Sequence, residues 1–195
     1  VGFKLHPACR VLQSSIEAVS ACARRHRIDP LTIDNIRLRA VPRACEWPFT
    51  NTRPRHMWAA QFSTPYAVAV VLQGMEPGPE WFSERTLTNP AVLDLADRIE
   101  LVPVPKKKIQ KKDHSYHVPA EAEIFSRGRV FRVRVDIARG ESARPLSAKQ
   151  RNAKFIRLAR HRISEEQAVA LQNKLVRLDQ VRSVRELAKV MEGSG

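Results

Sequence analysis

Cysteine is scarce in this sequence of 195 residues, which contains only Cys9, Cys22 and Cys45. The count is odd and the spacings are long, so neither a disulfide framework nor a zinc finger is expected. Free thiols persist in a reducing compartment, which predicts a cytoplasmic protein. Long apolar runs are also missing. The longest, residues 67–72, is far too short to cross a bilayer, so no membrane partner is expected.

Aromatic residues make up 6% of the chain, which is sparse for a protein that reads nucleic acid by base stacking. Signatures of familiar catalytic centres are absent too: there is no glycine-rich phosphate loop, no GxSxG and no HExxH. The six histidines are scattered, and the pair His114 and His117 has no third ligand nearby. An exposed loop is therefore favoured there over a metal site.

The sequence is strongly basic. It contains 34 Lys and Arg residues and 20 Asp and Glu residues, which gives a formal net charge of +14. Residues 106–112 (KKKIQKK) hold five lysines in seven positions. Such a run either contacts phosphates or is a solvated loop. The solvated loop is favoured, since no helix-turn-helix or RNP-type aromatic pattern accompanies the lysines. A basic nucleic-acid-binding module remains an alternative hypothesis.

Hydrophobic periodicity predicts an α+β fold, in which a few-stranded sheet with packed helices precedes an all-helical end. The predicted strands are residues 33–41 and 99–104 and a hairpin of residues 120–125 and 130–137. The predicted helices are residues 7–27, 57–73, 91–98, 147–160, 164–178 and 183–191. Gly74 is expected to end the second helix, and capping boxes are expected at Ser164 and Ser183.

The first twelve residues are the densest in chemically useful side chains. Lys4, His6, Cys9 and Arg10 surround Pro7 at a predicted helix start. A helix N-terminus favours bound anions and activates thiols, and a lysine there supplies a point charge for a carboxylate or an acid/base group. The alternative is an ordinary junction between a loop and a helix.

This junction, Phe3 to Arg10 (FKLHPACR), resembles the FK-x-[FY]-P-[AS]-C-R junction of the 2-methylcitrate dehydratase (MmgE/PrpD) family. Three further stretches resemble the same family in the same order. They are residues 32–41 (TIDNIRLRAV), residues 61–69 (QFSTPYAVA), and residues 145–147 (PLS) followed by Lys154 and Phe155. Together they cover almost the whole chain.

The resemblance implies a lid of α+β structure, a larger all-α domain and an active site between the two. This chain would be the C-terminal portion, with a helix leading into the lid (1–28), the lid (29–145) and closing helices (146–195) that pack on a missing N-terminal helical domain. Members act on small di- and tricarboxylates without a metal or other cofactor, by proton abstraction followed by elimination, decarboxylation or reprotonation. They are usually homodimers. The isolated chain is expected to be inactive.

Residue by residue, the resemblance assigns Lys4 to the active site, as a ligand of a substrate carboxylate or a proton-transfer group. Cys9 stands where cis-aconitate decarboxylases have a histidine, and it is the second catalytic candidate. Gln13 also replaces a histidine of many members, and His6 replaces an aromatic residue. Substrate-binding candidates are Lys4, His6, Arg10, Gln13, Ser63 and Tyr66; for Ser63 and Tyr66, capping and packing are the alternative. A third hypothesis is a lid remnant that pairs with a separately encoded N-terminal half.

Overall fold

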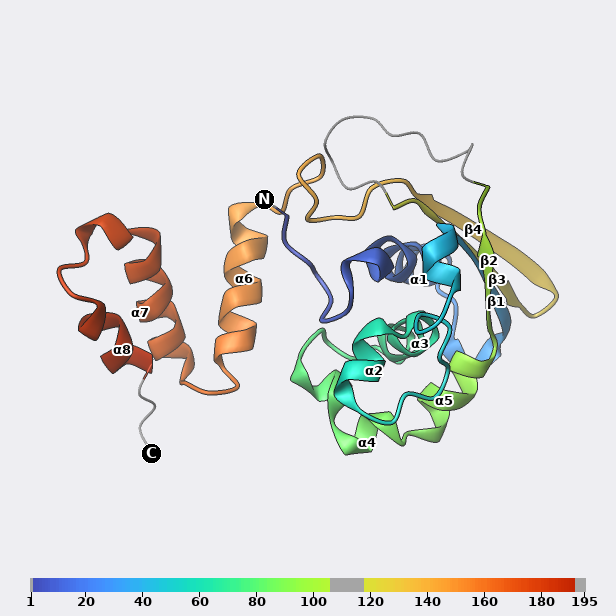
Figure 1. The fold of residues 1–195 in the computed structure, drawn as a ribbon, viewed down its shortest axis with the longest axis horizontal. Helices are drawn as coiled ribbons and strands as arrows, with labels where there is room; N and C mark the ends of the chain where they lie inside the picture. The colour runs from blue at the N-terminus through green and yellow to red at the C-terminus, as the bar shows by residue number, and fades with distance from the viewer. Residues whose placement is uncertain (1, 106–117, 192–195) are drawn as a thin grey trace. The chain divides into compact units, whose positions relative to one another are not determined.

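A four-stranded mixed sheet organises the larger part of the computed structural model, which describes residues 2–105 and 118–191 (Figure 1). Contacts divide the chain into two units, residues 1–145 and 146–195, and each is described by itself. The lysine run 106–112 and the pair His114 and His117 lie outside the described residues. The predicted α+β fold class is confirmed.

The sheet has the strand order β2-β1-β3-β4. Strands β1 and β2 are parallel, whereas β1 with β3 and β3 with β4 are antiparallel. Apolar and charged residues alternate along β1, which gives the sheet one apolar and one charged face. The strands are β1 (Ile33–Ala40), β2 (Ile99–Pro103), β3 (Ala120–Ser126) and β4 (Arg129–Val135), so the predicted strands and hairpin are confirmed.

Helices cover the apolar face of the sheet (Figure 1). Helix α1 (Gln13–His26) contacts β3, β4 and α3 (Thr64–Leu72), and α3 contacts α5 (Pro90–Asp97). The apolar residues Ile16, Val19 and Ala23 of α1 are buried, and α3 is buried on nearly all sides. Each large aliphatic side chain buried in this way stabilises the fold by about 1.5–3 kcal/mol relative to its exposure to water. This core fixes α1, whose N-terminal end carries the predicted site.

Glu123 lies on the opposite, charged face of the sheet and is only 5% exposed. Arg132 Nε lies 2.7 Å from one of its oxygens, and Arg39 and Arg37 reach the other at 3.4 and 3.7 Å. The hydrogen bond from Arg132 and the neighbouring guanidinium charges hold the pKa of Glu123 below its usual range. The buried carboxylate thus joins β1, β3 and β4 electrostatically.

The first helix begins later than predicted. Arg10–Leu12 form a short 3₁₀ helix, and α1 starts at Gln13 rather than near Pro7. The side chain of Gln13 bonds to the backbone of the preceding loop and satisfies polar groups there that a helix would otherwise have paired. The predicted start at Pro7 was therefore wrong, because the hydrogen bonds of the Gln13 side chain to this loop outweigh the helix signal of the proline.

The prediction of a single helix over residues 57–73 was also wrong, because the structure has two helices there, separated at Ser63. Residues Met57–Phe62 form α2, and α3 follows from Thr64. Ser63 has an extended backbone, and its hydroxyl accepts the N–H of Tyr66 as an N-cap. Gly74 adopts φ +75° just beyond α3, as predicted for a helix-ending glycine. A short helix, α4 (Glu84–Leu87), was not predicted.

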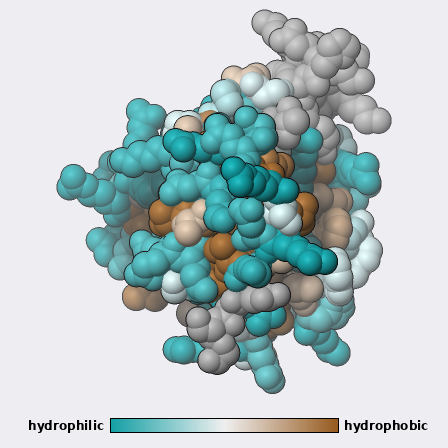
Figure 2. Space-filling view, turned by 90° about the vertical axis from the view of Figure 1, so that its left-hand side faces the viewer, coloured by the Kyte–Doolittle hydropathy of each residue, from teal (hydrophilic) through white to brown (hydrophobic). Residues whose placement is uncertain are grey.

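Residues 146–195 form the three predicted helices: α6 (Ala148–Ala159), α7 (Glu165–Val176) and α8 (Val184–Met191). Complete capping boxes start α6 and α7, where Ser147 and Ser164 exchange hydrogen bonds with the glutamines three residues later. Apolar side chains remain exposed between charged ones on α7 and α8, among them Val176 (73%) and Val184 (78%) (Figure 2). Among the described helices, none has the length and apolar character needed to span a membrane.

Candidate functional site

Gln13 organises the N-terminal junction, by which we mean residues 3–13. Its side-chain oxygen accepts the backbone N–H of His6 at 3.1 Å. Its amide nitrogen lies 3.2 Å from the carbonyl oxygens of His6 and Ala8 and 3.4 Å from that of Cys9. Gln13 is only 3% exposed, so these bonds form away from water. The backbone between His6 and Cys9 is therefore held in one conformation at the start of α1.

The ring of His6 stacks on Trp81, with 5.8 Å between the ring centroids and 26° between the planes. The hydroxyl of Tyr66 donates to the backbone carbonyl of Trp81. Burial raises the pKa of Tyr66, which keeps this hydroxyl protonated as a donor. Trp81 is 1% exposed, and its indole N–H has no hydrogen-bond partner among the residues that the structure describes. An unpaired buried donor beside His6 is a polar group that a bound water or ligand would satisfy.

Cys9 connects the junction to the break between α2 and α3. Its backbone N–H donates to the carbonyl of Gln61 at 2.8 Å. Two residues further along, the hydroxyl of Ser63 donates to the carbonyl of Asn51 and accepts the N–H of Tyr66 at 3.0 Å. Ser63 and Tyr66 are fully buried. Their contacts in this structure are those of capping and packing.

Arg10 pairs with Glu141, a buried carboxylate on the segment before residue 145. Two nitrogens of its guanidinium group take part: Nε donates to one carboxylate oxygen at 2.8 Å, and Nη2 donates to the other. The backbone N–H of Phe3 donates to the carbonyl of Gly140 at 2.8 Å beside this pair. Arg10 thus closes a two-pronged ion pair of the kind that fixes geometry as well as charge.

The structure therefore places the predicted residues in three groups. His6, Cys9 and Gln13 lie together in the junction, Ser63 and Tyr66 lie in the adjoining core, and Arg10 is directed to Glu141. Lys4 lies in the same N-terminal segment, with an exposed side chain.

Sequence reasoning missed Trp81 and Glu141. The tryptophan follows a turn rich in proline and glycine, where a large aromatic residue is itself a signal of a buried anchor. Glu141 had no comparable signal, because its partner Arg10 lies 131 residues away in the sequence.

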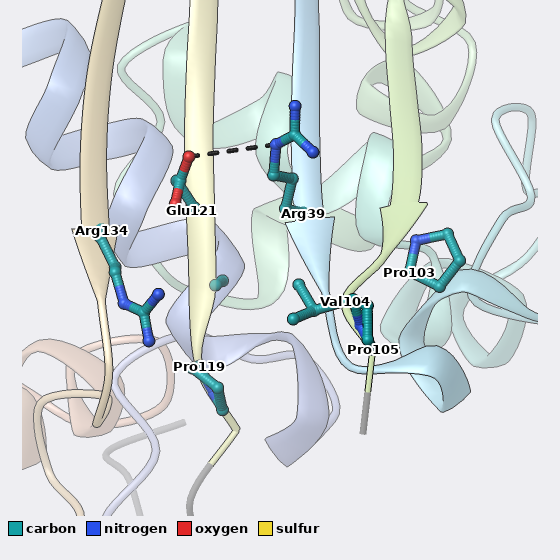
Figure 3. A pocket seen from close by; sticks show the side chains of 8 residues that line it. Arg39, Pro103, Val104, Pro105, Pro119, Glu121 and Arg134 are labelled. Atoms are coloured by element: carbon teal, nitrogen blue, oxygen red, sulfur yellow. Dashed lines mark ion pairs between the residues drawn. The ribbon is translucent and has the colours of Figure 1, made fainter. Parts of the chain in front are cut away.

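A separate pocket opens at one end of the charged sheet face (Figure 3). It has a volume of about 120 Å³, and Arg39, Arg134 and Glu121 line it together with prolines. Its cations are balanced: Arg39 lies 4.0 Å from Glu121, as the dashed line in Figure 3 shows, and Arg134 lies 2.7 Å from Asp136. None of the predicted site residues lines this pocket.

Residues 2–105 and 118–191 contain no group of three or more histidine, cysteine or acidic side chains placed to hold a metal ion. The three cysteines are unpaired, with Cys22 buried and the other two half-buried. The chemistry available at the junction is therefore that of a cation, an imidazole, a thiol and an indole donor.

The chain matches a known family: the family model of the MmgE/PrpD C-terminal domain matches residues 6–180. The resemblance drawn from four sequence motifs is thereby confirmed, although Lys4 lies just outside the matched range. No curated protein matches the chain.

Proposed function

Because the chain belongs to the MmgE/PrpD family, we propose that it is the lid-bearing C-terminal domain of a lyase or isomerase acting on small di- or tricarboxylates. The match over residues 6–180 is the observation that carries this proposal. It includes most of the junction, the sheet with its covering helices, and most of the closing helices. A 2-methylcitrate-like substrate is the first candidate.

The reaction that the resemblance implies begins with removal of a proton from a carbon next to a carboxylate. In a dehydration, the electrons of the broken C–H bond form the new C=C bond, and the hydroxyl on the neighbouring carbon leaves as water after receiving a proton. A positioned general acid or general base typically increases the rate of such a step by about 10²- to 10⁴-fold. In an epimerisation the proton instead returns on the other face.

In the proposed site, Lys4 binds a substrate carboxylate or assists the proton transfer. His6 and Cys9 are the neighbouring candidates for polar contact, and Gln13 positions both through their backbone. Trp81 joins the site as a donor beside His6. We assign Arg10, Ser63 and Tyr66 to positioning, since each already has a buried partner.

We further propose that an N-terminal helical domain of the family completes the site. The described side chains of the junction include no carboxylate base, and the exposed apolar residues of α7 and α8 suit packing on another helical surface. The working form is then a homo-oligomer in the cytoplasm. The 195-residue chain alone is expected to bind carboxylates weakly and to turn nothing over.

A titration of the chain with citrate and cis-aconitate, followed by NMR, tests the site. Lys4→Met removes the proposed carboxylate ligand, and Lys149→Met removes an exposed lysine at the start of α6 as a matched control. Loss of a charge-assisted hydrogen bond is expected to weaken binding by about tenfold in the first variant only. Equal binding by both variants would remove Lys4 from the site.

The nucleic-acid hypothesis gains little from the described residues. Arg37, Arg39 and Arg132 on the charged sheet face all lie within ion-pair distance of Glu123. Glu100 and Glu121 pair with the first two of these arginines as well, so three carboxylates balance the three cations. Binding to random DNA at low salt, with a steep salt dependence, would support this alternative.

A further inference from the structure

A second pocket lies at the C-terminal end of α1, against the turn that joins β3 and β4. We call it the hairpin pocket. It has a volume of about 220 Å³, and its basic lining residues are His26, Arg27, Arg127 and Arg129. Helix α1 has 14 residues, which at 1.5 Å each separates this pocket from the N-terminal junction by about 21 Å. The two sites are therefore distinct.

The arginines of the hairpin pocket differ from those elsewhere on the sheet. Arg37 and Arg132 lie in ion pairs with carboxylates. By contrast, Arg27, Arg127 and Arg129 form no ion pair with any residue in the described part of the chain. Their positive charges are thus not neutralised from within 2–105 and 118–191.

Two of these arginines also have an uncommon backbone conformation. Arg27 has φ +52° and Arg127 has φ +51°, both in the left-handed region that L-residues with a Cβ rarely adopt. Arg27 ends α1, a position where glycine or asparagine is usual. Arg127 precedes Gly128 in a two-residue hairpin turn, where Asn-Gly is the favoured pair. Two arginines thus occupy strained positions on the rim of one pocket.

The rest of the lining leaves the arginines as the donors of the pocket. The hydroxyl of Thr32 donates to the carbonyl of Asp29 at 2.8 Å and lies 2.8 Å from the hydroxyl of Ser126, so these two polar groups are already bonded within the chain. The ring of Phe131 supports Arg129, whose guanidinium carbon lies 5.1 Å from the ring centroid. Asp29 is the acidic lining residue, and its carboxylate already accepts the N–H of Leu31 at 3.0 Å. The arginines leave the pocket with a net positive charge.

We propose that the hairpin pocket binds the phosphoryl group of a small molecule. Guanidinium groups match phosphate oxygens in geometry, and phosphate carries more charge and more acceptors than one carboxylate. Three guanidiniums offer more charge and more donors than a single carboxylate can use. The volume accommodates a phosphoryl group and a small organic part. This inference does not depend on the proposed function, because it uses none of the residues of the N-terminal junction.

Calorimetric titration of the 195-residue chain with inorganic phosphate and with glycerol 3-phosphate tests the proposal. We expect saturable binding with a dissociation constant of about 1 mM or lower. Tighter binding of glycerol 3-phosphate assigns the site to a phosphorylated metabolite, and equal binding assigns it to free phosphate.

The decisive variant is Arg27→Asn with Arg127→Asn, because asparagine tolerates positive φ and keeps both backbone positions while the cations are lost. Binding should fall by about tenfold or more, with a melting temperature equal to or above that of the unmodified chain. Arg162→Asn with Arg182→Asn is the matched control, since it removes the same charge from exposed positions outside helices α6, α7 and α8. Absence of saturable phosphate binding, or an equal loss in the control, would overturn the proposal.

Discussion

The side chain of Gln13 and the backbone of His6 form a two-way pair of hydrogen bonds. The Gln13 oxygen accepts the His6 N–H at 3.1 Å, and the Gln13 amide donates to the His6 carbonyl at 3.2 Å. A side chain on the first residue of α1 thereby satisfies backbone groups seven positions earlier, as a neighbouring strand would. The conformation of the N-terminal junction depends on this one amide.

Replacing Gln13 with alanine should destabilise the fold by about 2 kcal/mol, because buried backbone groups of the junction lose their partners. The measurement is urea unfolding followed by circular dichroism. Gln180→Ala serves as a control, since this glutamine is exposed and should change stability by less than about 0.5 kcal/mol. Equal effects of the two substitutions would show that the junction is not held by Gln13.

The ion pairs of Glu123 should make the stability of the fold sensitive to acid pH. Its pKa is lowered in the folded state, first by the hydrogen bond from Arg132. Its contribution to stability is therefore fully present above the ordinary carboxyl pKa of about 4.3 and is lost as the pH falls through the lower folded-state value. Glu123→Gln should lower the melting temperature at pH 7 and flatten its decline toward acid pH.

The control for this acid profile is Glu165→Gln, which breaks an exposed ion pair with Arg160. Exposed pairs contribute little, so its melting profile from neutral to acid pH should run parallel to that of the unmodified chain. If the melting temperature of Glu123→Gln also ran parallel to that of the unmodified chain from neutral to acid pH, protonation of Glu123 would not affect the stability of the fold.

The buried hydroxyl of Tyr66 should make the stability of the fold decrease at alkaline pH. Burial raises its pKa in the folded state, so the unfolded chain releases this proton first. Its contribution to stability is intact below about pH 10 and diminishes above that value. Tyr66→Phe should cost about 1–2 kcal/mol at neutral pH, through loss of the bond to the Trp81 carbonyl, and should soften the alkaline decline. If the stability of Tyr66→Phe fell at alkaline pH as steeply as that of the unmodified chain, ionisation of Tyr66 would not be the cause of the decline.

The cysteines should differ in reactivity. Burial raises the pKa of the Cys22 thiol to about 11, and the side chain lies on the buried face of α1, in the core. Cys9 and Cys45 are half-buried. Alkylation of the native chain near neutral pH, read by mass spectrometry, should therefore modify these two well before Cys22, with all three equal after unfolding. Rapid native labelling of Cys22 would show that the core opens readily.

The sequence was sufficient to predict elements whose signals are local and periodic. Alternation along residues 33–41 and 130–137 predicted β1 and β4, and the capping serine at 164 predicted the start of α7. The predicted start of α1 was wrong because the side chain of Gln13 bonds to the backbone of the loop just before it, and hydrophobic periodicity does not reveal such side-chain bonds. The break at Ser63 did have a signal, since Pro65 with a preceding serine is typical of a helix start.

Only part of the candidate site could be predicted from the sequence, because several of its contacts join segments that are far apart along the chain. The cluster at Lys4, His6 and Cys9 is contiguous in the sequence, so composition alone drew attention to it. The stacking of His6 on Trp81 and the pairing of Arg10 with Glu141 join distant segments, which periodicity and spacing do not reveal. The same holds for the hairpin pocket, where the end of α1 meets the β3–β4 turn.

The central claim is that this chain supplies the lid and the Lys4 junction of an MmgE/PrpD enzyme whose site is completed by an N-terminal domain. The most direct measurement is turnover of 2-methylcitrate and cis-aconitate by the 195-residue chain, alone and with an N-terminal domain of the family added. We expect no turnover by the chain alone, and turnover by the combination that is lost when the chain carries Lys4→Met. Robust turnover by the chain alone would contradict the claim.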